Sequence, residues 1–181
     1  SEIVILMPIL LDFIKLMNLK YTDMTYVFHS TKEYFQLSQS FIKESGLTNC
    51  EIVSDDKIKS HILQKSVFAV AKSGTVSLEI SNAKIPSIIL YKMGFINFMI
   101  VKSLVKTKYA NIINFAANEE VIPELLQSNC NSQNIFKHVS NFLEDPNKIK
   151  DQVKKVQNVL DKLKINGSSS ELASLSLNKF L

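Results

Sequence analysis

The chain has 181 residues, which is enough for one well-buried domain and short for two. Apolar residues make up 46% of it and charged residues 21%, a globular composition that excludes a wholly disordered chain. The net charge of +4 is mild, so it does not demand a nucleic-acid partner, and it suits an anionic membrane surface or a phosphate ligand.

Cysteine and histidine are too sparse to predict a metal site or a disulfide framework. Cys50 and Cys130 are far apart, which predicts reduced thiols in a cytosolic protein. His29, His61 and His138 are scattered, and none has a second ligand at metal-binding spacing. No apolar run reaches the roughly 20 residues that span a bilayer, and the first residues lack the basic leader of a signal peptide. The chain is expected to be soluble or peripheral to a membrane.

The first segment allows two interpretations. A helix can run from residue 1 to about Met17, but Pro8 then lies inside it at a cost of about 3 kcal/mol. Alternatively, a strand at residues 3–7 precedes a helix that begins at Pro8. The pattern of residues alone favours neither.

Beyond Met17, strand and helix patterns alternate. Extended segments are expected at residues 25–29, 51–53, 67–71, 85–91 and 112–113. Helices are expected at residues 31–44, 55–63, 75–83, 95–105, 120–127, 133–143, 146–165 and 171–180, with a hinge at 166–170. This alternation predicts an α/β fold, a parallel sheet with helices on both faces.

Residues 72–75, Lys-Ser-Gly-Thr, join an apolar strand to a helix. Ligands of open α/β sheets bind beyond the carboxyl ends of the strands. Gly74 lets a ligand approach the backbone, Ser73 or Thr75 can cap the helix, and free N–H groups favour a phosphate. Glu79 lies one turn beyond Thr75, where a carboxylate can accept hydrogen bonds from two ribose hydroxyls. The alternative is a plain helix cap with a solvated glutamate.

Residues 73–79, Ser-Gly-Thr-Val-Ser-Leu-Glu, begin a series of blocks that resembles the lipid-A-disaccharide synthase family. The further blocks are Lys-Ile-Pro at 84–86, Tyr-Lys-Met at 91–93, Leu-Val-Lys-Thr-Lys-Tyr at 104–109, Asn114, Pro-Glu-Leu-Leu-Gln at 123–127 and Ser-Glu-Leu-Ala at 170–173. The similarity covers nearly the whole chain. The Val-Lys-Thr-x-Tyr block with its downstream asparagine is specific to that family, whereas the Ser-Gly-Thr…Glu element is shared by many GT-B glycosyltransferases.

The resemblance implies one half of a GT-B enzyme, which has two Rossmann-like halves around a cleft. Residues 1–145 would form the C-terminal, UDP-sugar-binding half, and residues 146–181 would be helices that cross to the other half or to a partner subunit. The family transfers 2,3-diacylglucosamine from UDP to 2,3-diacylglucosamine 1-phosphate, giving a β-1,6-linked disaccharide and UDP. No metal or other cofactor is implied.

The resemblance also assigns binding residues. Ser73, Gly74 and Thr75 would contact the diphosphate, Glu79 the ribose, Tyr91, Lys92 and Met93 the uridine side, and Asn114 the nucleotide sugar. The family's Gly-Ser-Arg loop and its acceptor-binding half, with the presumed catalytic base, have no counterpart in this sequence. No catalytic residue is therefore expected here, the fragment alone is expected to be inactive, and residues 1–17 are expected to be helical.

Residues 95–108 combine aromatic and basic side chains. Phe95, Phe98 and Met99 recur at helical spacing beside Lys102, Lys106 and Lys108. Such a helix can lie in a membrane interface, although a core-facing stripe with solvated lysines fits equally well. With the lipid substrates of the resembled family, the first interpretation implies a cytoplasmic protein held peripherally on the bacterial inner membrane.

Residues 148–164 place valines and leucines on one side of a highly charged helix, as expected of a helix packed on a partner surface or in a homodimer.

Two other functions fit the Ser73–Glu79 motif. One is another UDP-sugar enzyme, such as a muramyl-pathway glycosyltransferase or a UDP-sugar 2-epimerase, and the other is a non-catalytic nucleotide-binding module. No nucleic-acid partner is expected.

Overall fold

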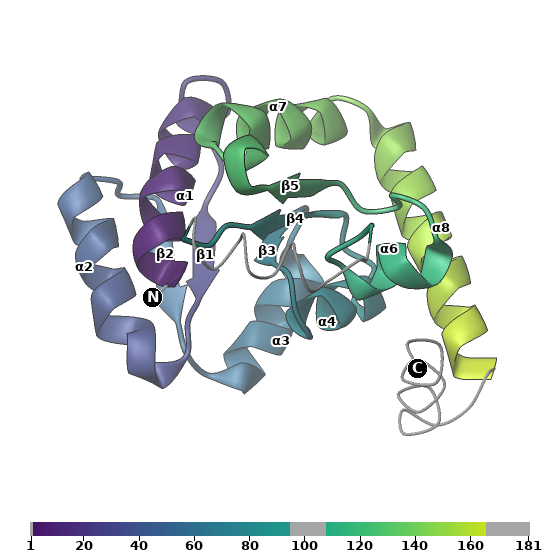
Figure 1. Cartoon of the computed structure of the whole chain (residues 1–181). Helices are drawn as coiled ribbons and strands as arrows, with labels where there is room; N and C mark the ends of the chain where they lie inside the picture. Colours follow the sequence, from purple (N-terminus) through teal and green to yellow (C-terminus); the bar gives the residue numbers. More distant parts are fainter. Residues whose placement is uncertain (1, 95–107, 166–181) are drawn as a thin grey trace.

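The computed structural model describes residues 2–94 and 108–165. Strands and helices alternate along these ranges, as the sequence pattern predicts (Figure 1). The strands are β1 (Tyr26–His29), β2 (Cys50–Val53), β3 (Ala69–Lys72), β4 (Ser87–Tyr91) and β5 (Glu124–Leu126). The helices are α1 (Glu2–Asn18), α2 (Phe35–Ser45), α3 (Asp56–Lys65), α4 (Val76–Asn82), α6 (Ile112–Ala117), α7 (Ser132–Leu143) and α8 (Pro146–Ile165), with 3₁₀ turns η1 (Lys32–Tyr34) and η2 (Gln127–Asn129).

The strand pairs among the described residues are all parallel. β1 pairs with β2, while β3, β4 and β5 form a second sheet with β4 in its centre. Parallel strands bring their carboxyl ends to one edge of a sheet, so Lys72 and Tyr91 end at the same edge of the second sheet. The predicted α/β architecture, one Rossmann-like half of the GT-B type, is confirmed.

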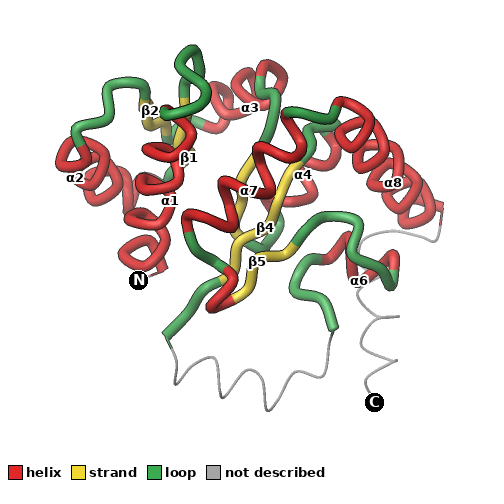
Figure 2. The backbone as a smooth tube through the Cα atoms, turned by 90° about the horizontal axis from the view of Figure 1, so that it is seen from above, coloured by secondary structure: helices red, strands yellow, loops and turns green. Residues whose placement is uncertain are grey.

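Helices cover both faces of the strands. In Figure 1, α7 lies above β4 and β5, α1 runs down the left side beside β1 and β2, and α3 and α4 lie below β3 and β4. Figure 2 shows α7 crossing over β4 and β5, with α8 to one side. This layering buries β4 between two helical layers, as is usual for a central strand of a parallel sheet, whereas β1 and β2 contain no fully buried residue.

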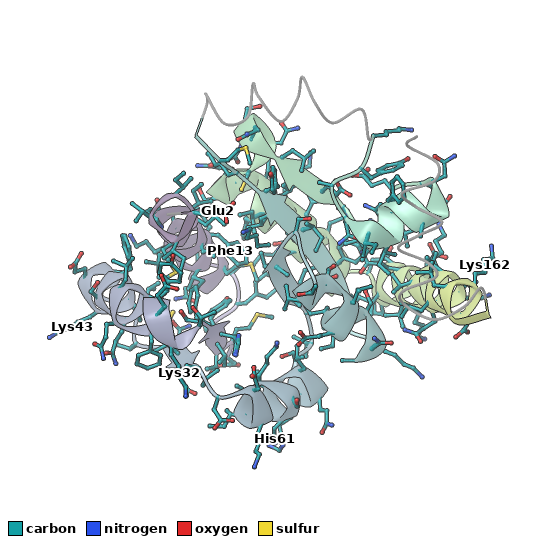
Figure 3. The ribbon with its side chains drawn as sticks, turned by 60° about the horizontal axis from the view of Figure 1, so that its bottom comes forward. Glu2, Phe13, Lys32, Lys43, His61 and Lys162 are labelled. Atoms are coloured by element: carbon teal, nitrogen blue, oxygen red, sulfur yellow. The ribbon has the colours of Figure 1, made fainter. Side chains whose placement is uncertain are left out.

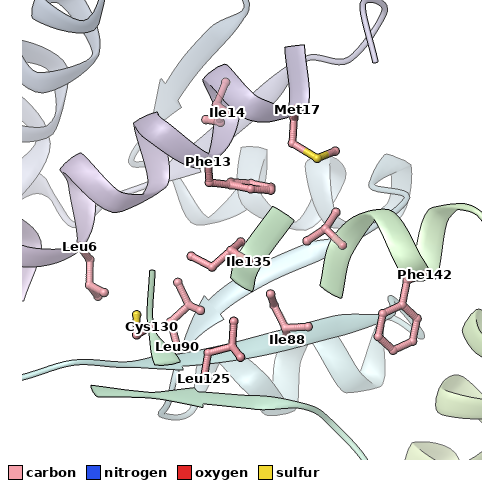
Figure 4. Packing of buried hydrophobic residues seen from close by; sticks show 11 residues of the cluster. Leu6, Phe13, Ile14, Met17, Ile88, Leu90, Leu125, Cys130, Ile135 and Phe142 are labelled. Carbon is pink, nitrogen blue, oxygen red and sulfur yellow. The ribbon is translucent and has the colours of Figure 1, made fainter. Parts of the chain in front are cut away.

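Side chains of β4 alternate between two hydrophobic clusters. Ile88 and Leu90 point to the layer of α1 and α7, where they pack with Phe13 and Ile135 (Figure 4). Ile89 points the other way, into a cluster formed with α4, α6 and α8. All three isoleucine and leucine side chains are at most 2% exposed. The period of two explains why residues 87–91 form a central strand.

The first segment is one helix of 17 residues with Pro8 inside it, so the alternative of a strand at residues 3–7 is wrong. Proline removes the hydrogen bond to the carbonyl of Val4. Both residues lie on the exposed side of α1, where water can reach that carbonyl. The opposite side buries Phe13 and Met17, and this burial offsets the cost of the proline.

Two expected elements are wrong. Residues 112–113 begin the helix α6, because the Oδ1 atom of Asn111 accepts a hydrogen bond from Ile113 N at 2.8 Å and caps it. Residues 120–127 contain the strand β5 instead of a helix. Within β5, Leu125 is buried against α7 between two half-buried neighbours, and pairing with β4 overrides the local helix preference. The helices expected at 95–105 and 171–180, and the hinge at 166–170, lie outside the described residues.

Charged side chains occupy the periphery of the described fold. Figure 3 shows Lys32, Lys43, His61 and Lys162 pointing away from the body, whereas Phe13 points into it. A helix both long and apolar enough to cross a bilayer does not occur in the described part of the chain.

Candidate functional site: the loop after β3

The loop that follows β3 depends on Gly74. This residue has φ +149°, a backbone conformation that residues with a side chain rarely adopt. A Cβ atom added there would meet no other atom within 4 Å. The requirement for glycine therefore comes from the backbone conformation, and the space above the loop is open.

Three backbone donors of this loop are free. Ser73 N donates to Leu90 O at 3.1 Å, which ties the loop to β4. The N–H groups of Gly74, Thr75 and Val76 have no hydrogen-bond partner among the residues that the structure describes. Gly74 and Thr75 are exposed, so an anion can reach these donors from solvent.

The side-chain cap predicted at this helix is wrong. The hydroxyl of Ser73 donates instead to Ala110 O at 2.6 Å and thereby joins the loop to the segment before α6. Thr75 has helical backbone angles, and its side chain makes no capping bond. The turn is closed from within α4, because the hydroxyl of Ser77 donates to Gly74 O at 2.7 Å.

Glu79 lies in the first turn of α4, and its side chain is 48% exposed. Its Oε2 atom forms an ion pair with the Nζ atom of Lys59 from α3. The structure therefore pairs the carboxylate, which lies one turn from the free donors, with a cation from α3 that the sequence did not indicate.

Tyr91, Lys92 and Met93 follow the carboxyl end of β4, next to the loop. The Nζ atom of Lys92 donates to Cys130 O at 3.0 Å, and Met93 N donates to the Oε1 atom of Gln127 at 3.3 Å. These bonds fix the segment to η2. The three side chains are half-buried, so each keeps some surface for a ligand.

Asn114 is fully buried, with 0% of its surface exposed. Its Oδ1 atom accepts from Val121 N at 2.9 Å and Ile122 N at 2.8 Å. Its Nδ2 atom donates to Ile122 O at 2.6 Å and to the Glu124 carboxylate at 2.8 Å. The structure thus gives Asn114 the task of holding the segment before β5, and its predicted contact with a nucleotide sugar stays a prediction.

Glu124 is a site residue to which sequence reasoning gave no role. Its carboxylate accepts hydrogen bonds from Ala110 N at 2.8 Å and Asn111 N at 2.9 Å. It thereby holds the segment whose Ala110 carbonyl receives the Ser73 hydroxyl. The signal was present in the sequence, because Glu124 belongs to the Pro-Glu-Leu-Leu-Gln block at 123–127.

Comparison with known proteins decides the family. The model of the family described as lipid-A-disaccharide synthetase matches residues 1–177. The chain belongs to the lipid-A-disaccharide synthase family. The resemblance inferred from the Ser-Gly-Thr…Glu and Val-Lys-Thr-x-Tyr blocks is therefore confirmed.

Named members of the lipid-A-disaccharide synthase family align with nearly the whole chain. The enzyme of Rickettsia prowazekii (strain Madrid E) is 32% identical over 171 residues, which cover 94% of this chain and 44% of that protein. The enzyme of Sulfurihydrogenibium sp. (strain YO3AOP1) is 30% identical over 184 residues, with 97% and 47% covered. This chain therefore spans less than half the length of these two relatives.

The segment predicted to face a membrane lies outside the residues that the structure describes. Its predicted membrane-facing residues are Phe95, Phe98, Met99, Lys102 and Lys106. The structure resumes at Lys108, which is exposed. Its Nζ atom lies 5.1 Å from the centre of the Tyr109 ring, close enough for a cation–π contact.

Two histidine side chains of this synthase family member have pKa values below the usual value for histidine. Burial lowers the pKa of His29 below its usual value, and the charge of Lys59 adds to the effect, while the carboxylates of Asp56 and Glu79 oppose it. Burial also lowers the pKa of His138. Below about pH 6.5, the unfolded chain therefore binds more protons at these positions than the folded chain.

We expect the free energy of unfolding to rise between pH 5 and pH 7. The contribution of His29 and His138 is fully present above about pH 6.5 and is lost as the pH falls through their lowered pKa values. Urea unfolding at several pH values measures this slope, and the double variant His29→Asn, His138→Asn should flatten it. A wild-type stability that stays level or falls over this interval would contradict the expectation.

Proposed function

We propose that the loop at residues 72–75 and Glu79 form the UDP-binding part of a lipid-A-disaccharide synthase. The free N–H groups of Gly74, Thr75 and Val76 would donate to the diphosphate, and the Glu79 carboxylate would accept from the ribose hydroxyls. Lone backbone donors in an open loop are a common way to bind phosphate oxygens. These three free donors beside an exposed carboxylate are the observation that carries the proposal.

The remaining predicted contacts belong to the same proposal. Tyr91, Lys92 and Met93 would border the uridine, since they follow the strand next to β3. Asn114 would face the nucleotide sugar, and its hydrogen bond to Glu124 would in addition support the segment at Ala110.

The reaction proposed for the whole protein is transfer of 2,3-diacylglucosamine from UDP to 2,3-diacylglucosamine 1-phosphate. Because this chain spans less than half of its relatives, we assign it the donor site only. The acceptor site and the catalytic base would come from the other part of the protein, and this chain alone would not catalyse transfer. Peripheral contact with the inner membrane and pairing of subunits through the C-terminal helices are parts of the same proposal.

Calorimetry with UDP tests the donor site. We expect the 181-residue chain to bind UDP and Glu79→Ala to bind it about tenfold more weakly, because a hydrogen bond to a charged group contributes about 1.5–3 kcal/mol. Glu44→Ala removes an exposed carboxylate from the last turn of α2 and serves as the matched control.

The control should bind UDP as the unchanged chain does. A folded chain that gives neither heat nor changes in amide chemical shifts with UDP would refute the proposed function.

A further inference from the structure

Side chains from β1, α3 and α4 meet beside the loop at residues 72–75. Lys59 of α3 is only 15% exposed, and its Nζ atom forms an ion pair with Glu79 of α4. His29 ends β1, and its Nε2 atom lies 3.6 Å from the Oδ1 atom of Asp56. The ends of three different elements thus converge on the carboxylate that we propose for the ribose.

The position of Lys59 is set by the cap of α3. The Oδ1 atom of Asp55 accepts from Lys57 N at 2.7 Å and from Ile58 N at 3.3 Å. The carbonyl of Asp55 accepts from Lys59 N at 2.9 Å. The first turn of α3 is therefore capped at Asp55, shortly after the end of β2, and the backbone from which Lys59 extends is well defined.

The two partners of the ion pair differ in their exposure to solvent. Lys59 is mostly buried and Glu79 is half-exposed, so the lysine is the anchored partner and the carboxylate is the accessible one. The ion pair places Lys59 Nζ next to Oε2, while Oε1 has no hydrogen-bond partner among the described residues. An ion pair at one oxygen restrains the orientation of the whole carboxylate, and therefore also of its other oxygen.

His29 does not compete strongly for this carboxylate. Its pKa is lowered by burial and by the charge of Lys59, so at neutral pH the imidazole is mostly uncharged. The cation that faces Glu79 is therefore Lys59.

We propose that Lys59 is a positioning residue for the ribose contact: it holds Oε2 of Glu79 so that Oε1 points to the ribose hydroxyls. This inference rests on the proposed UDP site and adds a residue that neither the Ser-Gly-Thr…Glu motif nor the resemblance identified. Lys59 acts through Glu79 and itself touches neither the sugar hydroxyls nor the reacting atoms.

The preference for UDP over 2′-deoxy-UDP tests the proposal, because removing the 2′-hydroxyl removes a partner of Glu79. We expect the unchanged chain to bind UDP about tenfold more tightly than the deoxy analogue. In Lys59→Met and Lys59→Gln this ratio should fall to about twofold, since the carboxylate loses its orientation. Lys59→Arg should keep most of the ratio, because a guanidinium also binds a carboxylate.

Lys65→Met removes the same charge from the exposed, opposite end of α3 and should leave the ratio unchanged. In a Glu79→Gln background, Lys59→Met should have no further effect on the ratio. Circular dichroism checks that each variant is folded.

The outcomes separate the two proposals. If the unchanged chain does not bind UDP, the proposed function fails and this inference fails with it. If it binds UDP with a preference over the deoxy analogue, and Lys59→Met and Lys59→Gln keep that preference, only the role of Lys59 is overturned. A fall in affinity for both ligands by the same factor would show a merely structural contact and would also overturn that role.

Discussion

Replacing Asn114 by alanine should lower the free energy of unfolding by about 3 kcal/mol. The substitution removes both acceptor bonds to Val121 N and Ile122 N and the donor bond to Ile122 O. Val121 and Ile122 are 7% and 1% exposed, so water cannot easily replace the lost partners. An unpaired buried polar group costs about 1–3 kcal/mol, which makes this one of the most sensitive side chains of the fold.

Urea unfolding followed by circular dichroism measures this loss. Asn158→Ala is a matched control, because the same side chain is removed from an exposed position of α8. The control should change stability by less than about 0.5 kcal/mol. If Asn114→Ala unfolds at the same urea concentration as the unchanged chain, the amide does not hold the segment before β5 in the way described.

Gln152→Ala should cost about 3 kcal/mol as well. The side-chain amide of Gln152 completes the edge of β4 where β5 does not reach. Ser87 N donates to its Oε1 atom at 2.8 Å, and its Nε2 atom donates to Ser87 O at 3.0 Å. Ile89, two residues further along β4, donates from the same side to Pro123 O. Both Ser87 and Gln152 are buried, so alanine would leave a backbone N–H and C=O without partners.

Gln39→Ala, at an exposed position of α2, is the control for Gln152 and should be nearly neutral. Gln152→Leu keeps the volume but not the hydrogen bonds, and it should be about as destabilising as alanine. A leucine variant as stable as the unchanged chain would show that packing alone, and not the paired amide, attaches α8 to β4.

The order of strands and helices could be predicted because each element carries its own signal. The apolar alternation of Ile88, Ile89 and Leu90 indicates a central strand. Gly46 ends α2 with φ +73°, as expected of a helix that stops at glycine. The failures lie at residues 112–113 and 120–127. At 112–113 the missed signal is local, because Asn111 caps α6, whereas at 120–127 the conformation depends on pairing with β4 and on the bond from Asn114 of α6 to Glu124 of β5. No local pattern contains such bonds.

The sequence predicted the residues of the candidate site that belong to the motif at 73–79. It did not predict the residues that contact and support this motif. Gly74 and Glu79 could be found because they lie in a short, recognisable segment. The partners that hold this segment in place are remote in sequence: Lys59 lies on the preceding helix α3, and Ala110 comes after β4 in the chain. The position of the C-terminal helix was equally hidden, since Gln152, Val156 and Leu160 of α8 pack on the body of the fold. Whether residues 146–181 also cross to another half or subunit stays a prediction.

The division into two sheets has a consequence for how cooperatively the molecule unfolds. No ladder of backbone hydrogen bonds joins β1–β2 to β3–β4–β5 in the described ranges. One link is α1, whose Phe13 packs edge-on against Tyr26 of β1 and shares a cluster with Ile88 of β4. At its end, Asn18 exchanges amide hydrogen bonds with Asn49 before β2. The side chains of α1 therefore couple the two sheets without any backbone ladder between them, so the stability of each sheet depends on α1.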